Sequence, residues 1–490
     1  MKLFTIGDSI SQGFMSGSAS RTQYAYSTLI AKCMGLFPGS LKDKDSNYYF
    51  PAWQAHGIPA SIEEIFRAIT EKCGADISLT EWPMVLKAAA KIIDESEDYY
   101  ERGGGAAENQ YPGRIPFFHN VSVRDFTVAD AWAVTPDVCW EMIESARAFE
   151  KIDGLFTAAN AFIYRTALKV LSPNLDCSRS QLDWLKFHAQ KEGVDNLILF
   201  LGANNALRTV VTLTIKETPN DPARRPASLT HKERVKEGWN LWHPADFEDE
   251  YRTLLDKVEE AMKGNRARLW RVFLGTVPLV TALPLLKGLG QGMEIPGKGF
   301  YFDKYTFFPF DEKFADESKL RLTRDEAIHI DDNIRAYNAT IKALAAERNA
   351  ALKQALGPFH VVDIFSSFNQ IAWQRNNGKP TYEFPPAFAQ ASPKVDSRYY
   401  HADVQGRLVR GGLFSLDGLH PTAIAQGLLA HEFIKVMEKE AMLKFRSPLD
   451  WADIFKSEPL TQRPIPLMQE LYRHPKLAHF AGRLIGYFRK

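Results

Sequence analysis

The sequence predicts an α/β protein with a mostly parallel central sheet and helices on both of its faces. Short apolar segments, typical of strands buried on both faces, occur at 3–8, 196–201, 269–275 and 359–365. Longer segments with helical periodicity separate them, and this alternation is typical of parallel strands joined by crossover helices. Hydrophobic residues make up 45% of the 490 residues and charged residues 24%, which fits a globular chain with a sizeable core.

The helices are predicted in order along the chain. A helix at about 21–34 follows the first strand, and helical periodicity returns between 60 and 101. It stops at Gly103–Gly105, where residues without a Cβ predict a flexible joint. In the C-terminal half, one helix begins near Asp246 and a last one follows Pro421.

A long helix is expected to begin at Thr323. Thr323 and Glu326 stand at the spacing of a capping box, and the helical pattern continues to about Leu356.

Insertions are predicted at about 40–117, 207–244, 281–322 and 373–412. The last three are loop-rich and are expected to line one edge of the sheet, whereas 40–117 includes the helical segment described above. We therefore expect a single domain over 1–440 and a C-terminal extension over 441–490. The glycine-rich stretch 292–299 approximates a phosphate-binding loop. Gly299, however, stands where Ser or Thr would hold magnesium, so a simple Gly/Pro loop is expected there.

The composition argues against several classes of function. Sixty Lys and Arg against 59 Asp and Glu give a net charge of +1, so no nucleic-acid partner is expected. The four cysteines are far apart and form no C-x-x-C pair, which argues against a disulfide framework or a zinc site and favours a reducing compartment. Neither a leader peptide nor an apolar stretch of about 18 residues is recognised, so we expect a cytoplasmic protein. No metal and no cofactor are expected.

The first motif whose residues could take part in catalysis is Gly7-Asp8-Ser9-Ile10-Ser11, directly after the first strand. In α/β folds, ligands bind beyond the carboxyl ends of the strands. A serine on a strand-to-helix turn exposes its hydroxyl there, close to the positive end of a helix. Taken alone, such a serine is more often a helix N-cap.

Two further motifs are ambiguous when each is taken alone. In Asp417-Gly418-Leu419-His420-Pro421, the Asp417 carboxylate could accept a hydrogen bond from the imidazole and fix its tautomer. The same residues also fit an Asp-Gly turn before a helix. In Gly202-Ala203-Asn204-Asn205, an amide after a strand could donate to an oxyanion, or the segment could be a simple turn.

Together and in this order, the three motifs resemble those of the SGNH hydrolase family, also called the GDSL esterase/lipase family. Ser9 matches the nucleophile block, Asn204 the block that supplies an oxyanion-hole amide, and Asp417 with His420 the D-x-x-H block. The resemblance implies a flavodoxin-like, three-layer α/β/α sandwich with about five strands. Two small departures are Ile10, where the family has Leu, and Asn205, where it has Asp.

The block that carries the family's glycine departs most. Segment 120–130 looks like this block, and Asp125 stands at the position of the glycine. Asp125 keeps a backbone N–H and tolerates a positive φ better than most residues. Its carboxylate would oppose a developing negative charge, so we expect it to turn away or to pair with Arg124 or Arg114. Gly113 is a weaker candidate because its surroundings do not match the block.

The resemblance implies hydrolysis of a carboxyl ester through an acyl-enzyme intermediate. Ser9 would be the nucleophile, His420 the general base and Asp417 its partner. The oxyanion hole would be formed by the Ser9 and Asp125 N–H groups and the Asn204 side chain. Two alternatives stay open: a carbohydrate O-deacetylase of the same family, and a catalytically weak relative that acts as a binding module.

Two further segments lead to hypotheses about the substrate, which we expect to be a small acyl ester or a lipid. The aromatic stretch 300–310 could line an acyl groove, although core packing of an insertion is the commoner role of such a stretch. Residues 476–490 predict a basic amphipathic helix, which could contact an anionic membrane surface. Docking of this helix on the protein body is the commoner alternative.

Overall fold

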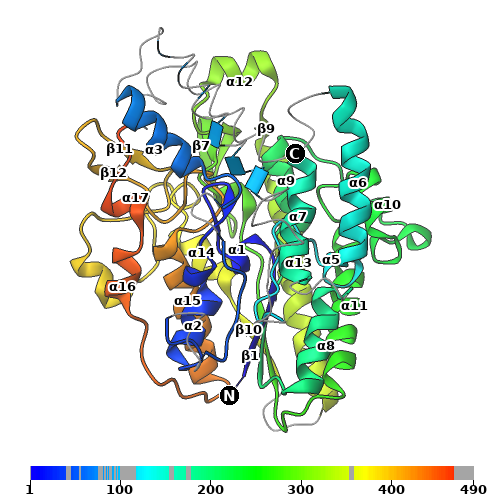
Figure 1. Cartoon of the computed structure of the whole chain (residues 1–490). Coiled ribbons are helices and arrows are strands. Elements are labelled where there is room, and N and C mark those ends of the chain that lie inside the picture. The colour runs from blue at the N-terminus through cyan, green and yellow to red at the C-terminus, as the bar shows by residue number, and fades with distance from the viewer. Residues whose placement is uncertain are drawn as a thin grey trace.

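The computed structural model describes residues 2–39, 46–53, 57–74, 117–153, 159–172, 178–352, 358–467 and 469, with scattered positions between 81 and 99. A parallel sheet stands between two groups of helices in this part of the chain (Figure 1). The protein is therefore of the α/β class, as the sequence predicts. Gly103–Gly105 and 476–490 lie outside the described residues.

The central sheet consists of four parallel strands in the order β1-β5-β6-β10. They are β1 (Leu3–Gly7), β5 (Asn196–Phe200), β6 (Arg271–Gly275) and β10 (Phe359–Val362). Each lies within one of the four predicted segments. Nearly all of their residues are buried, which explains why the strands are apolar throughout and do not alternate between apolar and polar residues.

A fifth segment, 119–123, runs parallel along the free edge of β1. The Thr5 N–H donates to the His119 carbonyl at 2.8 Å, and the Val121 N–H donates to the Thr5 carbonyl at 3.1 Å. With this segment counted second in chain order, the sheet has the order 2-1-3-4-5. Strand addition therefore reverses direction at β1, and in doubly wound folds such a switch point opens a ligand crevice at the carboxyl ends of the strands.

Helices lie on both sides of the sheet (Figure 1), an arrangement compatible with the predicted three layers. One side carries α2 (Tyr26–Cys33) and α15 (Ala423–Lys439). The other carries α8 (Gln181–Lys191), α11 (Pro244–Met262) and α13 (Arg324–Leu352).

The start of α13 confirms the predicted capping box. The backbone N–H and the hydroxyl of Thr323 donate to Glu326 Oε2 at 2.7 and 2.9 Å, and the Glu326 N–H returns a bond to Thr323 Oγ1 at 3.2 Å. The helix is described as far as Leu352, so its predicted end near Leu356 lies outside the described residues.

Segment 281–322 is not the loop-rich insertion that the sequence predicts. It contains an antiparallel hairpin of β7 (Leu286–Ile295) and β8 (Gly299–Phe307), to which β9 (Leu322–Thr323) adds a third strand. The glycine-rich stretch 292–299 forms the end of β7 and the turn of this hairpin.

The remaining helices and strands are short or lie at the edges of the fold. The short strands are β2 (Phe14–Met15), β3 (Ser18–Ala19), β4 (Ile58–Pro59), β11 (His401–Ala402) and β12 (Leu408–Arg410). The first half of the chain adds the helices α1 (Ser9–Gln12), α3 (Ile62–Cys73), α5 (Asp130–Ala133), α6 (Pro136–Asp153), α7 (Ala159–Leu171), α9 (Asn204–Thr212) and α10 (His231–Glu237). The second half adds α12 (Glu312–Ser318), α14 (Ile364–Ile371), α16 (Trp451–Lys456) and α17 (Pro459–Gln462).

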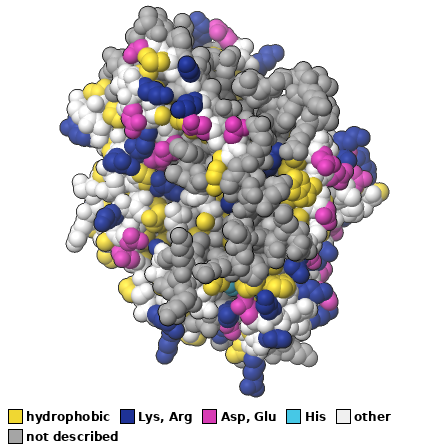
Figure 2. Space-filling model, in the orientation of Figure 1, with side chains coloured by type: hydrophobic (Ala, Val, Ile, Leu, Met, Phe, Trp, Pro, Cys, Tyr) yellow, Lys and Arg dark blue, Asp and Glu magenta, His cyan; other side chains and the backbone are white. Residues whose placement is uncertain are grey.

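The described surface carries both signs of charge. Figure 2 shows Lys and Arg side chains interspersed with Asp and Glu over the face drawn, in keeping with a net charge of +1. Among the helices that the structure describes, none has both the length and the apolar content needed to cross a membrane.

Candidate active site

Ser9 lies at the carboxyl end of β1, on the first residue of α1. Asp8 caps this short helix, because its carboxylate accepts the Ile10 N–H at 3.0 Å. A Cβ at Gly7 would lie 2.2 Å from Ser11 Oγ, so the turn needs glycine at this position. Ser9 lies on the strand-to-helix turn that its motif predicts, but the residue is buried, whereas an exposed hydroxyl was expected.

Asp417 and His420 lie in the loop that leads into α15, far from Ser9 in the sequence. Gly418 sits between them with φ +67°, and a Cβ there would lie 2.8 Å from the Leu285 backbone. The tight turn brings Asp417 Oδ2 within 2.8 Å of His420 Nδ1. The predicted Asp-Gly turn and the predicted Asp–His contact are therefore the same feature.

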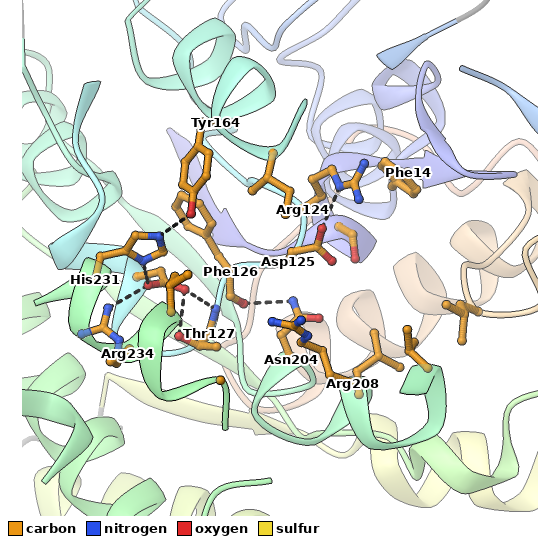
Figure 3. Close-up of a pocket in the computed structure, with 18 of the residues that line it drawn as sticks. Phe14, Arg124, Asp125, Phe126, Thr127, Tyr164, Asn204, Arg208, His231 and Arg234 are labelled. Carbon is orange, nitrogen blue, oxygen red and sulfur yellow. Dashed lines mark hydrogen bonds and ion pairs between the residues drawn. The ribbon is translucent and has the colours of Figure 1, made fainter. Parts of the chain in front are cut away.

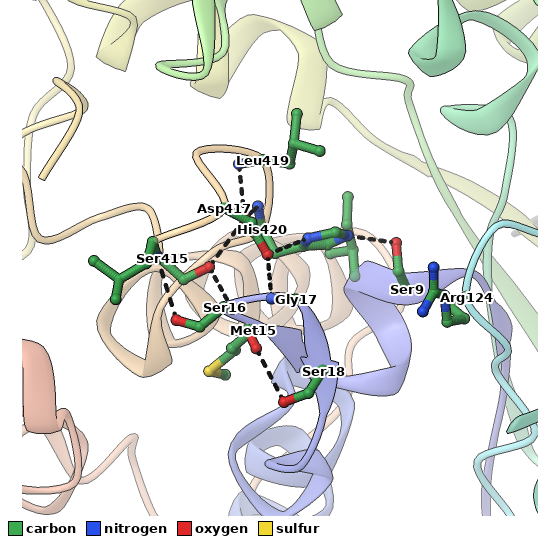
Figure 4. A network of polar contacts seen from close by, with 12 residues as sticks. Ser9, Met15, Ser16, Gly17, Ser18, Arg124, Ser415, Asp417, Leu419 and His420 are labelled. Atoms are coloured by element: carbon green, nitrogen blue, oxygen red, sulfur yellow. Dashed lines mark hydrogen bonds and ion pairs between the residues drawn. The ribbon is translucent and has the colours of Figure 1, made fainter. Parts of the chain in front are cut away.

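Figure 4 shows the hydrogen bonds that join Asp417, His420 and Ser9. His420 Nε2 lies 2.9 Å from Ser9 Oγ. Because the Asp417 carboxylate accepts from Nδ1–H, Nε2 carries the lone pair and accepts the Ser9 hydroxyl proton. The Phe14 ring packs against the imidazole, with 4.7 Å between ring centroids, and holds its plane in place. The structure thus brings Ser9 together with His420, which lies 411 positions further along the chain and only three positions after Asp417.

The Asp417 carboxylate is fully enclosed by donors. The Leu419 and His420 N–H groups donate to Oδ1 at 2.9 Å, and the Gly17 N–H donates to Oδ2 at 2.9 Å. Burial alone would raise the pKa of Asp417, but the charge of His420 and these hydrogen bonds outweigh burial and lower it to about 2. The group is therefore ionised at neutral pH and can stabilise an imidazolium on His420.

Asn204 begins α9 at the carboxyl end of β5, the strand next to β1. One hydrogen of its side-chain amide is donated to the Phe126 carbonyl at 3.0 Å. The neighbouring Asn205 has a different role: it accepts the Val128 N–H at 3.1 Å and donates to Glu250 at 3.1 Å. Asn205 therefore ties segment 126–128 to α9 and α11. The second amide hydrogen of Asn204 has no hydrogen-bond acceptor among the residues that the structure describes.

Asp125 has a positive φ of 61°, the conformation expected for a residue in a glycine position. Its carboxylate pairs with Arg124 Nε at 2.8 Å, which confirms one of the two expected partners (Figure 3). Arg114 and Gly113 lie outside the described residues. The Asp125 backbone N–H donates no hydrogen bond within the part of the chain that the structure describes.

One pocket of about 520 Å³ is lined by Ser9, Asp125, Asn204 and His420. Its apolar wall includes Phe14, Met142, Val211, Trp239 and Trp242. Several wall residues come from 207–244, one of the segments expected to be insertions. No residue of the aromatic stretch 300–310 lines the pocket, and Tyr301 and Tyr305 are buried elsewhere, so core packing is the role of this stretch.

The far wall of the same pocket holds a polar cluster that the sequence did not reveal (Figure 3). Asp130 Oδ1 lies 2.8 Å from both His231 Nδ1 and Arg234, and His231 Nε2 lies 3.0 Å from the Tyr164 hydroxyl. Burial would raise the pKa of Asp130, but the charges of His231 and Arg234 outweigh it and lower the pKa well below its usual range. The four residues come from three distant segments, and no short motif links them.

A second histidine cluster, far from this pocket, has the residue types of a metal site: His119, His188 and Glu192. His119 Nδ1 accepts the Tyr49 N–H at 2.9 Å, so its proton is on Nε2, which donates to Glu192 at 3.0 Å. His188 Nδ1 contacts the same carboxylate oxygen at 2.5 Å. Both imidazoles therefore contact the Glu192 carboxylate directly. The Nε2 atom of His119 carries a proton, so it has no lone pair that could bind an ion shared with His188 and Glu192.

Comparisons with known proteins give no further guide, since no family model, no curated protein and no solved structure matches the chain.

Proposed function

We propose that this protein is a serine hydrolase of carboxyl esters and a member of the SGNH hydrolase family, with the three-layer α/β/α fold of that family. One observation carries the proposal. Ser9, His420 and Asp417 form an unbroken chain of hydrogen bonds, at 2.9 and 2.8 Å, that opens into a pocket. This geometry is that of an activated serine nucleophile, because the base is in contact with the hydroxyl and is itself oriented by a third group.

In the proposed reaction, His420 Nε2 takes the Ser9 proton while Ser9 Oγ attacks the ester carbonyl carbon. The resulting imidazolium is stabilised by the ionised Asp417 carboxylate. The tetrahedral intermediate then collapses, the bond to the alcohol oxygen breaks, and His420 returns the proton to the leaving alcohol. Water, deprotonated by His420, hydrolyses the acyl-Ser9 ester in the same way and restores the enzyme.

The negative charge on the carbonyl oxygen would be bound by three donors. They are the N–H of Ser9, which has no intrahelical partner at the start of α1, the N–H of Asp125 and the second amide hydrogen of Asn204. All three residues line the pocket beside the nucleophile. The Arg124–Asp125 ion pair supports this assignment, because the guanidinium offsets the charge of the Asp125 carboxylate, which would otherwise oppose the oxyanion.

The lining of the pocket favours an ester with an apolar part over an acetylated carbohydrate. Aromatic and aliphatic side chains such as Met142, Val211 and Trp239 form much of its wall. Burial of a hydrocarbon chain against them would contribute about 25 cal/mol per Å² of apolar area. The expected substrate is therefore an acyl ester or lipid, and O-deacetylation of a sugar is the second candidate.

The test is hydrolysis of p-nitrophenyl esters from acetyl to long acyl chains by the wild-type protein and by Ser9→Ala. We expect activity that falls at least about 1000-fold in Ser9→Ala, since removal of a triad nucleophile leaves only binding and oxyanion effects. A fluorophosphonate should label Ser9 in the wild type and leave Ser9→Ala unlabelled. Ser11→Ala, two residues along the same turn, is the matched control and should stay labelled.

Absence of activity on every ester, together with absence of labelling, would overturn the proposal and favour a binding module. A cytoplasmic location and a membrane contact through 476–490 stay proposals as well. Deletion of 476–490 should weaken association with anionic liposomes, and unchanged association would contradict the membrane contact.

A further inference from the structure

One of the arginines that line the pocket has no acidic partner among the described residues. Three arginines line it, and two of them are paired: Arg124 with Asp125 and Arg234 with Asp130, each at 2.8 Å. The third, Arg208, forms no ion pair and no side-chain hydrogen bond with any residue in the described part of the chain. Arg208 is solvent-exposed and lines the same pocket as Ser9 and His420.

Arg208 is presented to the pocket by the helix that carries Asn204. Residues 204, 207, 208 and 211 all line the pocket, and this spacing of three and four residues places them on one face of α9. Arg208 is one helical turn after Asn204, and Figure 3 shows the two side chains next to each other. A group bound by Arg208 would therefore belong to the same molecule whose carbonyl oxygen reaches Asn204.

The helix α9 does not itself stabilise the positive charge of Arg208. Arg208 is the fifth of the nine residues of α9, midway between the two ends, where the macrodipole favours neither sign of charge. No acidic residue lies in the first turn of α9. An anion supplied by a ligand would be attracted by the guanidinium itself.

We propose that Arg208 binds an anionic group of the ester substrate, a carboxylate or a phosphate, while the apolar wall holds the hydrocarbon part. This inference rests on the proposed function and specifies the substrate as an anionic, amphiphilic ester. A guanidinium is suited to this role because its planar fork matches the oxygen pairs of both anions. Arg208 is thus a specificity residue, and the oxyanion donors are separate from it.

The experiment compares esters that differ in one charge. With the charge on the alcohol side, 4-acetoxybenzoate and 4-acetoxyphenyl phosphate are measured against methyl 4-acetoxybenzoate. With the charge on the acyl side, mono-4-nitrophenyl glutarate is measured against 4-nitrophenyl pentanoate. Ser9→Ala gives the background for each compound. The two aryl anions distinguish a carboxylate from a phosphate as the preferred group.

The variants are Arg208→Gln, Arg208→Lys and, as a matched control, Arg268→Gln, which changes an exposed arginine just before β6, at the other end of the sheet. We expect Arg208→Gln to lower kcat/KM about 10- to 100-fold for the preferred anionic ester, mainly through KM. Neutral esters should change less than about threefold. Arg208→Lys should restore part of the loss, and Arg268→Gln should behave as the wild type.

Two results would overturn the inference while the proposed function stands. One is Ser9-dependent hydrolysis of neutral esters with no preference for either anion. The other is an equal loss in Arg208→Gln for neutral and anionic esters, which would make Arg208 an oxyanion or structural residue. Failure of the wild type to hydrolyse any ester would instead contradict the proposed function itself.

Discussion

At the scale of single residues, Asp125 is the most informative departure from the pattern of the proposed family. Its φ of 61° destabilises the folded state by about 1 kcal/mol for a residue other than glycine. Glycine avoids this strain, but it loses about the same free energy on folding because its backbone is more flexible in the unfolded chain. Asp125→Gly keeps the backbone N–H and removes the carboxylate. We therefore expect a free energy of unfolding within about 1 kcal/mol of the wild type and a kcat/KM for neutral esters within about threefold.

Stability should be measured by urea unfolding and activity with p-nitrophenyl acetate. Asn220→Gly is the matched control, since Asn220 also has a positive φ of 51° but lies on the surface away from the pocket. A loss of tenfold or more in Asp125→Gly alone would contradict the assignment of the Asp125 N–H as the functional group. It would show that the carboxylate and its bond to Arg124 are required.

The residues predicted from the sequence are those that short motifs contain. Asp417 and His420 are three positions apart, and Ser9 and Asn204 directly follow strands, so local pattern was sufficient to find them. Pairing of Asp125 with Arg124 followed from adjacency. Tyr164 and His231 carry no such signal, because their place in the pocket depends on how α7 and α10 pack.

At the scale of elements, the hairpin of β7 and β8 shows why one region was mispredicted. Three glycines in ten residues argue against a strand in β7. The fold explains two of them: a Cβ at Gly288 would lie 2.0 Å from the Phe302 ring, and one at Gly292 would lie 2.1 Å from the Phe300 ring. The glycines make room for aromatic rings of the partner strand, a cross-strand effect that a sequence window cannot reveal.

The start of α15, which directly follows the loop of His420, depends on a residue of the C-terminal extension. Buried Glu458 accepts the Ala423 N–H at 2.8 Å and the Leu460 N–H at 3.0 Å. In Glu458→Ala both N–H groups lose their acceptor, which should lower the free energy of unfolding by about 1 to 3 kcal/mol. We also expect a lower kcat, since the turn that holds His420 is less well anchored.

The measurement is thermal unfolding together with ester hydrolysis. Glu438→Ala, which changes an exposed carboxylate on the same helix, is the control and should leave both quantities unchanged. If Glu458→Ala unfolds at the wild-type temperature, the extension does not stabilise the start of α15.

At the scale of the whole molecule, the site follows from the strand order. The carboxyl ends of β1 and β5, where Ser9 and Asn204 lie, meet at the switch point of the 2-1-3-4-5 sheet. The alternation of strands and helices predicted the parallel sheet. It did not predict which strands are neighbours, because segment 119–123 has no strong strand pattern and reaches its place only through pairing with β1.

The pH dependence of global stability should reflect three fully buried carboxyl groups. Burial raises the pKa of Asp8, Glu250 and Glu458 to about 7 each. Because these values exceed those in the unfolded chain, the folded state binds more protons between about pH 4 and pH 7, and stability falls as pH rises through this window. Buried His188 opposes this below about pH 6.5, since burial lowers its pKa to about 4.

Comparison with Asp8→Asn isolates one of these contributions. Asparagine can still accept the Ile10 N–H as the cap of α1, but it cannot ionise. The free energy of unfolding of the variant, relative to that of the wild type, should therefore increase between pH 4.5 and pH 7 by at most about 1.4 kcal/mol per pH unit. Urea unfolding at four pH values measures this difference. Asp311→Asn makes the same exchange at the exposed cap of α12 and is the control.

A difference between Asp8→Asn and wild type that stays constant with pH would mean that Asp8 ionises as freely in the folded protein as in the unfolded chain. In that case the turn that carries Ser9 would be open to water, and the proposed active site would be less enclosed than its hydrogen bonds indicate.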